Sequence, residues 1–104
     1  MAIQSRVLTT TAANIFASTT TTGDVVSVMY FCNRTASPTT FNLHIVPAGG
    51  TATVNNIAYS NKTVASNDTY IIDLEKILLS QGDMLQAKAN TGNAIVVTVS
   101  TLGI

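Results

Sequence analysis

The sequence predicts an all-β protein: a single-domain antiparallel β-sandwich or small jelly roll of seven to eight short strands, spanning residues 1–104. Three observations lead to this prediction. Short runs rich in Val, Ile, Thr and aromatic residues recur about every ten residues along the chain. Turn-forming Gly, Pro, Asn and Asp residues separate these runs. A chain of 104 residues is also large enough for one two-layer core and too small for a second.

Two weak strands precede the most apolar part of the chain. Residues 3–9 alternate loosely between polar and apolar side chains, and their low apolar content is typical of an edge strand. Residues 14–17 form a second short strand. The polar residues 18–24, which include Gly23, then turn the chain into the next strand.

The strongest strand signals lie in residues 25–32 and 41–46, which are rich in Val, Ile and aromatic side chains. Residues 33–40 between them have the composition of a turn, so we expect the two segments to form a central antiparallel hairpin. If Asn33 faces Thr40, the pairs on the core side are Cys32 with Phe41, Tyr30 with Leu43, and Val28 with Ile45. A slip of one residue would exchange the two faces of the hairpin.

The opposite face of this hairpin is half apolar and is the candidate interface. It carries Met29, Phe31, His44 and Val46. A small soluble monomer would normally make such a face more polar, so we expect a homo-oligomer, such as a ring or trimer. In that assembly a neighbouring subunit covers this face or the edge strand at residues 3–9.

The middle of the chain gives weaker signals. Pro47 and the following glycines end the hairpin, and residues 51–56 are expected to be a loop. Residues 57–64 form either two short strands or one bent strand, and residues 69–73 form another strand. Residues 74–79 are expected to be irregular or a single turn, because they are too few for a stable helix.

The last two strands have a clear period of two. In residues 84–89 we expect Leu85, Ala87 and Ala89 to point inward, with Met84, Gln86 and Lys88 outward. A turn at residues 90–93 leads into residues 94–101. The inward side chains of that final strand are Ile95, Val97 and Val99, which complete the predicted core together with Tyr30, Leu43 and Ile45.

Composition argues against several classes of partner. Only 10% of residues are charged, against about 25% in ordinary soluble domains. The five Lys and Arg residues are scattered, so we expect no nucleic-acid binding. We expect no membrane association either, since no apolar run is long enough to span a bilayer. Residues 1–6 lack the regions of a secretory signal, which predicts synthesis in the cytoplasm.

The candidate reactive residues do not form a catalytic or metal site in the predicted register. Cys32 and His44 fall on opposite faces of the hairpin, where they cannot form a thiol–imidazole pair. Cys32 is expected to be a small buried hydrophobic side chain, and His44 lacks further ligands at a spacing suitable for metal. We therefore predict no enzyme activity, no metal and no cofactor.

Several segments, in order along nearly the whole chain, carry a resemblance to a known group of proteins. They are residues 7–15, the strand 25–33 that ends in Cys-Asn, residues 43–50, 68–70 and 79–87. The chain resembles small virion structural proteins of tailed bacteriophages, of the marine or cyanophage type. It departs from that group at residues 20–24, where those proteins often have a Pro-Ala-Gly turn.

This resemblance implies a non-enzymatic virion protein, made in the host cytoplasm, that serves as a capsid decoration or cement protein or as a head–tail accessory subunit. Its partners would be other capsid or tail proteins and further copies of itself. The alternatives are a tail, baseplate or fibre component, or a glycan-binding jelly-roll module. A glycan-binding module should show an aromatic-lined cleft, yet the chain contains no Trp.

Overall fold

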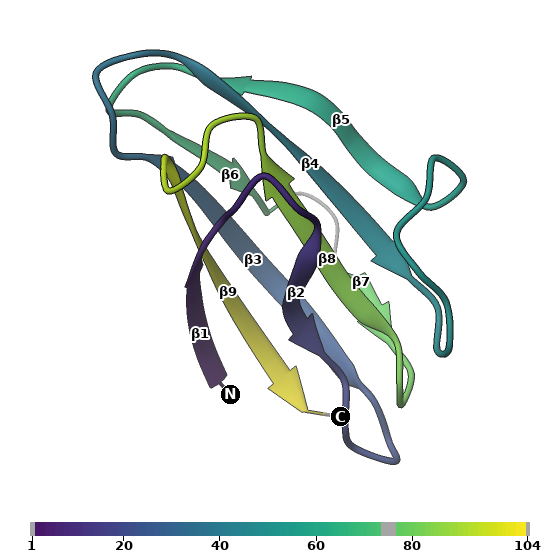
Figure 1. Ribbon diagram of the computed structural model, residues 1–104. Coiled ribbons are helices and arrows are strands. Elements are labelled where there is room, and N and C mark those ends of the chain that lie inside the picture. The colour runs from purple at the N-terminus through teal and green to yellow at the C-terminus, as the bar shows by residue number, and fades with distance from the viewer. Residues whose placement is uncertain (1, 74–76, 104) are drawn as a thin grey trace.

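The computed structural model describes residues 2–73 and 77–103 and confirms the predicted β-sandwich (Figure 1). These residues form nine strands and no helix. The strands are β1 (Ala2–Val7), β2 (Ala13–Ala17), β3 (Asp24–Asn33), β4 (Thr39–Val46), β5 (Ile57–Val64), β6 (Thr69–Ile72), β7 (Ile77–Leu79), β8 (Met84–Ala89) and β9 (Ile95–Gly103).

The strands divide into two antiparallel sheets that face each other, as Figure 1 shows. A five-stranded sheet has the order β1-β9-β3-β6, and β7 also pairs with β3. A four-stranded sheet has the order β2-β8-β4-β5. In the first half of the chain, successive strands alternate between the sheets, which is the arrangement of a jelly roll. The edge position predicted for the first strand is confirmed, because β1 pairs with β9 alone.

Most strand positions agree with the sequence predictions, with one strand more than expected. Residues 57–64 are one strand with irregular pairing, and Asn61 within it has a φ of 50°. The additional strand is β7, which pairs with residues 24–26 of β3 where an irregular segment was expected. Residues 74–76 of that predicted segment lie outside the described part of the chain.

The predicted central hairpin is wrong, because β3 and β4 belong to different sheets. The expected pairs, such as Cys32 with Phe41, therefore do not form: Cys32 pairs with Thr69 and with Val96. Residues 34–38 carry the chain from one layer to the other. Across the sandwich, the rings of Phe31 and Phe41 stack with centroids 3.9 Å apart and an interplanar angle of 5°.

The buried side chain of Asn33 fixes this crossing. Its Nδ2 donates to the carbonyl oxygens of Ser37 (2.8 Å) and Val64 (3.1 Å). Its Oδ1 accepts from the backbone N–H and the hydroxyl of Thr35, at 3.0 and 2.7 Å. Asn33 is fully buried, so the amide hydrogen bonds replace those that water would otherwise make. The side chain thus joins the end of β3 to the crossing segment and to the end of β5.

The predicted face of β3 is also wrong. A bulge between Val26 and Val28 shifts its pairing with β9. Met29 and Phe31 point into the core, while Tyr30, expected inside, is 40% exposed on the outer face. The inward positions predicted for β8 and β9 are confirmed, as is Leu43, and Ile45 packs against the core while partly buried. These confirmed core residues are Leu85, Ala87, Ala89, Ile95, Val97 and Val99.

Candidate functional site

The four residues of the candidate interface do not form an exposed surface. Met29 and Phe31 lie between the two sheets, with exposures of 1% and 0%. His44 and Val46 do point away from the core, as predicted, but they are 7% and 0% exposed. The predicted candidate interface is therefore wrong at these positions. Met29 and Phe31 point inward because β3 does not pair with β4 and faces it across the core, and a covering loop explains the burial of His44 and Val46.

This cover is the segment between β4 and β5, residues 47–56. His44 Nδ1 lies 2.9 Å from Asn56 Oδ1, and the Ile45 N–H donates to the Asn56 carbonyl oxygen at 3.0 Å. At the other end of the segment, the Gly50 N–H donates to the Pro47 carbonyl oxygen, which closes a tight turn. His44 and Val46 were expected to be covered by a neighbouring subunit, and the chain itself covers them.

An exposed apolar surface does exist, on the outside of the five-stranded sheet. The strand register places Val25 between Leu78 of β7 and Leu102 of β9, and places Tyr30 beside Ile71 of β6. Leu78, Leu102 and Ile71 are 70%, 51% and 48% exposed. Further along the same face lie Ile3, Val7, Val28, Cys32 and Val96. We call these ten residues the apolar face.

Charged side chains are absent from the described strand positions of this face. The other described strand residues that share the face are hydroxyl-bearing: Ser5, Thr69, Thr98 and Ser100. None of these strand positions carries an acidic or basic side chain. An apolar face without charges has few groups that interact favourably with water, and such exposed patches on soluble proteins mark interaction sites.

The outside of the four-stranded sheet is polar instead. One row across it contains Asn14, Gln86 and His44, in which Gln86 Nε2 donates to Asn14 Oδ1 at 2.7 Å. The next row contains Lys88 and Asn42, whose Oδ1 accepts from the Asn61 N–H at 2.7 Å. The two outer faces of the sandwich thus differ sharply in chemistry.

A groove crosses this polar face. Its larger part encloses about 410 Å³ and a smaller adjoining hollow about 100 Å³, and the two share Thr10, Asn42 and Lys88. Strands β8 and β4 supply the floor, with the residues before β2 on one side and the covering loop and β5 on the other. The remaining lining residues are Thr11, Ala12, Thr40, His44, Ala52, Thr53, Val54, Ile57, Asn61, Ala89 and Asn90.

Among the described residues, Lys88 is the only charged side chain that lines the groove. The described carboxylates lie elsewhere: Asp24 accepts from the Ser18 hydroxyl at 2.7 Å, and Asp83 accepts from the backbone of Ala48 and Ser80. Lys62, a second lysine of this sheet, lies over the ring of Tyr70 at 4.7 Å. Within residues 2–73 and 77–103, Lys88 has no ion pair or hydrogen bond.

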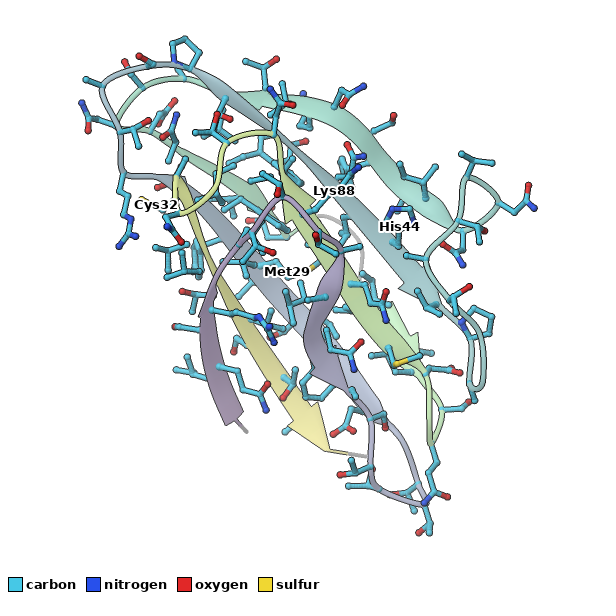
Figure 2. The ribbon with its side chains drawn as sticks, viewed as in Figure 1. Met29, Cys32, His44 and Lys88 are labelled. Atoms are coloured by element: carbon cyan, nitrogen blue, oxygen red, sulfur yellow. The ribbon has the colours of Figure 1, made fainter. Side chains whose placement is uncertain are left out.

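Cys32 and His44 cannot act together. Cys32 lies on the apolar face and His44 on the outside of the other sheet, and Figure 2 shows them well apart. The expectation that Cys32 is buried is wrong, since its side chain is half-buried on the outer surface. Over the described ranges there is no group of three or more His, Cys, Asp or Glu residues placed to hold a metal ion. That part of the chain likewise has no helix long and apolar enough to cross a membrane.

Sequence reasoning missed both surfaces in part. It placed Lys88 and His44 away from the core, but nothing in the sequence showed that residues 47–56 would fold over β4 and form one wall of a groove. It predicted an apolar second face, but on the wrong residues of β3. Comparisons of this chain with protein-family models, with curated proteins and with solved structures found no match.

Proposed function

We propose that this chain is a non-enzymatic structural subunit that assembles with a second copy of itself through the apolar face. The observation that carries the proposal is the outer face of the five-stranded sheet, whose described strand positions carry no charge and expose Leu78, Leu102, Ile71 and Tyr30. The resemblance to small phage virion proteins extends the proposal: the assembly belongs to a phage particle, in which the chain serves as a decoration, cement or head–tail accessory subunit. Jelly rolls recur in viral capsid domains, which agrees with this by analogy of fold.

The size of the apolar face suits an interface. Because β6 and β7 both pair with β3 on the same side, the face is four strands wide. Strands about 4.8 Å apart, and about 3.4 Å per residue over the nine residues of β9, give a flat area of roughly 600 Å². Side-chain relief adds to this, so the face approaches the roughly 800 Å² per partner of a standard protein interface.

A second copy is the partner that this surface fits best. A face without charges offers nothing to select an oppositely charged protein, whereas two identical apolar sheets can pack face to face about a two-fold axis. The net charge of zero also leaves little long-range repulsion between copies. Contact through the face would remove its exposed Leu, Ile and Tyr side chains from water.

Replacing Tyr30 with aspartate should give a folded but dissociated protein. The wild type should sediment at twice the 10.9 kDa subunit mass or more at micromolar concentrations, and Tyr30→Asp at the subunit mass. The charge would be buried unpaired in the interface, while the outward position leaves the core untouched. Val54→Asp is the matched control, because Val54 is 84% exposed on the covering loop of the other sheet. A wild type that remains a single subunit, or equal dissociation by Val54→Asp, would contradict the proposal.

Cys32 provides a chemical test of the same interface. Since its thiol lies on the apolar face, we expect a bulky thiol reagent to label the dilute native protein readily and the concentrated protein several-fold more slowly. The measurement is the labelling rate of the wild type across a hundredfold range of protein concentration. A rate that does not depend on concentration would place the contact between copies somewhere other than this face.

A further inference from the structure

We propose that the groove on the four-stranded sheet binds an acidic sugar residue, with Lys88 pairing with the sugar carboxylate and Asn42 and His44 contacting its hydroxyls. This site is separate from the apolar face and does not depend on the assembly proposed above. The groove volume of about 410 Å³ lies within the range of small-molecule sites. Figure 2 shows His44 and Lys88 on the neighbouring strands β4 and β8.

The charge of the groove selects an anion. Lys88 is its only charged side chain, no described lining residue is acidic, and Lys88 has no counter-ion within the described chain. An ammonium group held beside protein surface gains most from a carboxylate, because charge-assisted hydrogen bonds are about twice as strong as neutral ones. The other basic residue of this sheet, Lys62, is occupied by the ring of Tyr70.

The covering loop fixes the tautomer of His44. The orientation of the Asn56 amide is set by two backbone groups: the Thr53 N–H donates to Oδ1 at 3.1 Å, and Nδ2 donates to the Thr51 carbonyl oxygen at 2.7 Å. The His44 nitrogen that faces Oδ1 must therefore be a donor, so Nδ1 carries the proton. In the neutral ring, Nε2 is then an acceptor.

His44 Nε2 is open to the groove. This atom has no hydrogen-bond partner among the described residues. Every buried side-chain nitrogen or oxygen of those residues does have a partner, so Nε2 is not buried and must be accessible to solvent. His44 lines the groove, and an acceptor at this point suits a ligand hydroxyl. The side-chain hydroxyls and amides of Thr10, Asn42 and Thr53 add further groups that can both donate and accept.

The spacing of these groups suits one sugar ring. Lys88 pairs with Asn42, and His44 lies two residues further along β4, so Lys88 and His44 are diagonal neighbours on one face. Such neighbours are about 7 to 8 Å apart, a span that a pyranose with its carboxylate can bridge. None of the described lining residues is Trp, Tyr or Phe, so a neutral sugar would lack the aromatic stacking on which its binding commonly relies. The carboxylate would supply the attraction instead.

Binding of defined probes to the intact chain tests the proposal. A galacturonic acid trisaccharide should bind in calorimetric or NMR titrations. Its methyl ester, which lacks the charges, and glutarate, which lacks the hydroxyls, should each bind about tenfold more weakly or worse. No binding of the acidic trisaccharide at millimolar concentration would overturn the proposal. Equal binding of the ester would overturn the role of charge, and equal binding of glutarate would overturn sugar recognition.

Two matched variants locate the site. Lys88→Gln removes the charge, keeps a polar side chain that is only one bond shorter, and should weaken binding of the acidic trisaccharide about tenfold or more. Lys62→Gln, which removes the same charge from the edge strand β5 of this sheet, should leave the binding unchanged. Circular dichroism and the unfolding midpoint check that both variants fold. Equal binding by Lys88→Gln and the wild type would overturn the assignment, as would an equal loss in both variants.

Discussion

Replacing Phe31 with alanine should lower the free energy of unfolding by about 3 to 5 kcal/mol, as removal of a fully buried Phe typically does. Phe31 is 0% exposed, and its ring stacks on Phe41 of the opposite sheet at 3.9 Å. The substitution would both open a cavity and remove one of the direct contacts that hold the two layers together. Chemical denaturation followed by far-ultraviolet circular dichroism measures the loss.

Tyr30→Ala is the control, because Tyr30 is the neighbour of Phe31 on the outer face. Its removal should cost about 1 kcal/mol or less, the usual scale for a side chain on an exposed sheet surface. Both variants should be compared at several protein concentrations, so that any effect of assembly on Tyr30 is separated from folding. If Tyr30→Ala proved more damaging than Phe31→Ala in the monomer, the assignment of the two faces of β3 would be reversed.

Replacing Asn33 with alanine should cost about 2 to 5 kcal/mol. The buried carbonyl oxygen of Val64 and the partly buried one of Ser37 would lose their donor, and an unsatisfied buried group costs about 1 to 3 kcal/mol. The crossing between the two sheets would then lose its main polar anchor. The unfolding free energy of the variant gives the cost directly.

Two further variants separate the donor and acceptor roles of Asn33. Asn33→Asp keeps the acceptors but turns a carboxylate toward two carbonyl oxygens, so it should be at least as unstable as Asn33→Ala at neutral pH. Thr35→Val removes one donor to Asn33 Oδ1 and retains the backbone donor, so it should cost only about 1 kcal/mol. Near wild-type stability of Asn33→Asp would show that the Nδ2 contacts contribute little.

The parts of the fold that could be predicted are those where one face of a strand is apolar and the other polar. In β8, Leu85 and Ala87 alternate with Gln86 and Lys88, and the structure confirms which side is buried. In β3 both faces are apolar, so the period of two identifies a strand but not its orientation. The bulge at residues 26–28 then shifts the alternation within the strand.

The prediction of which strands pair failed for a different reason. Segments that follow one another in sequence usually pair, but Asn33 makes its hydrogen bonds to residues 35 and 37 and to Val64, which directs the chain into the other sheet. A buried Asn with four satisfied hydrogen bonds has the same sequence signature as an ordinary turn residue. The groove was hidden for a similar reason, since it depends on how residues 47–56 pack over β4.

The opposed chemistry of the two outer faces has a geometric consequence. In a two-fold pair joined through the apolar face, the grooves of the two subunits would open in opposite directions, away from the contact. A single polymer chain could not readily enter both, so the gain in avidity that comes from two sites on one ligand would be small. Such a pair, with two binding sites, would cross-link separate polysaccharide chains. It would also bring together two surfaces that each carry such a polysaccharide.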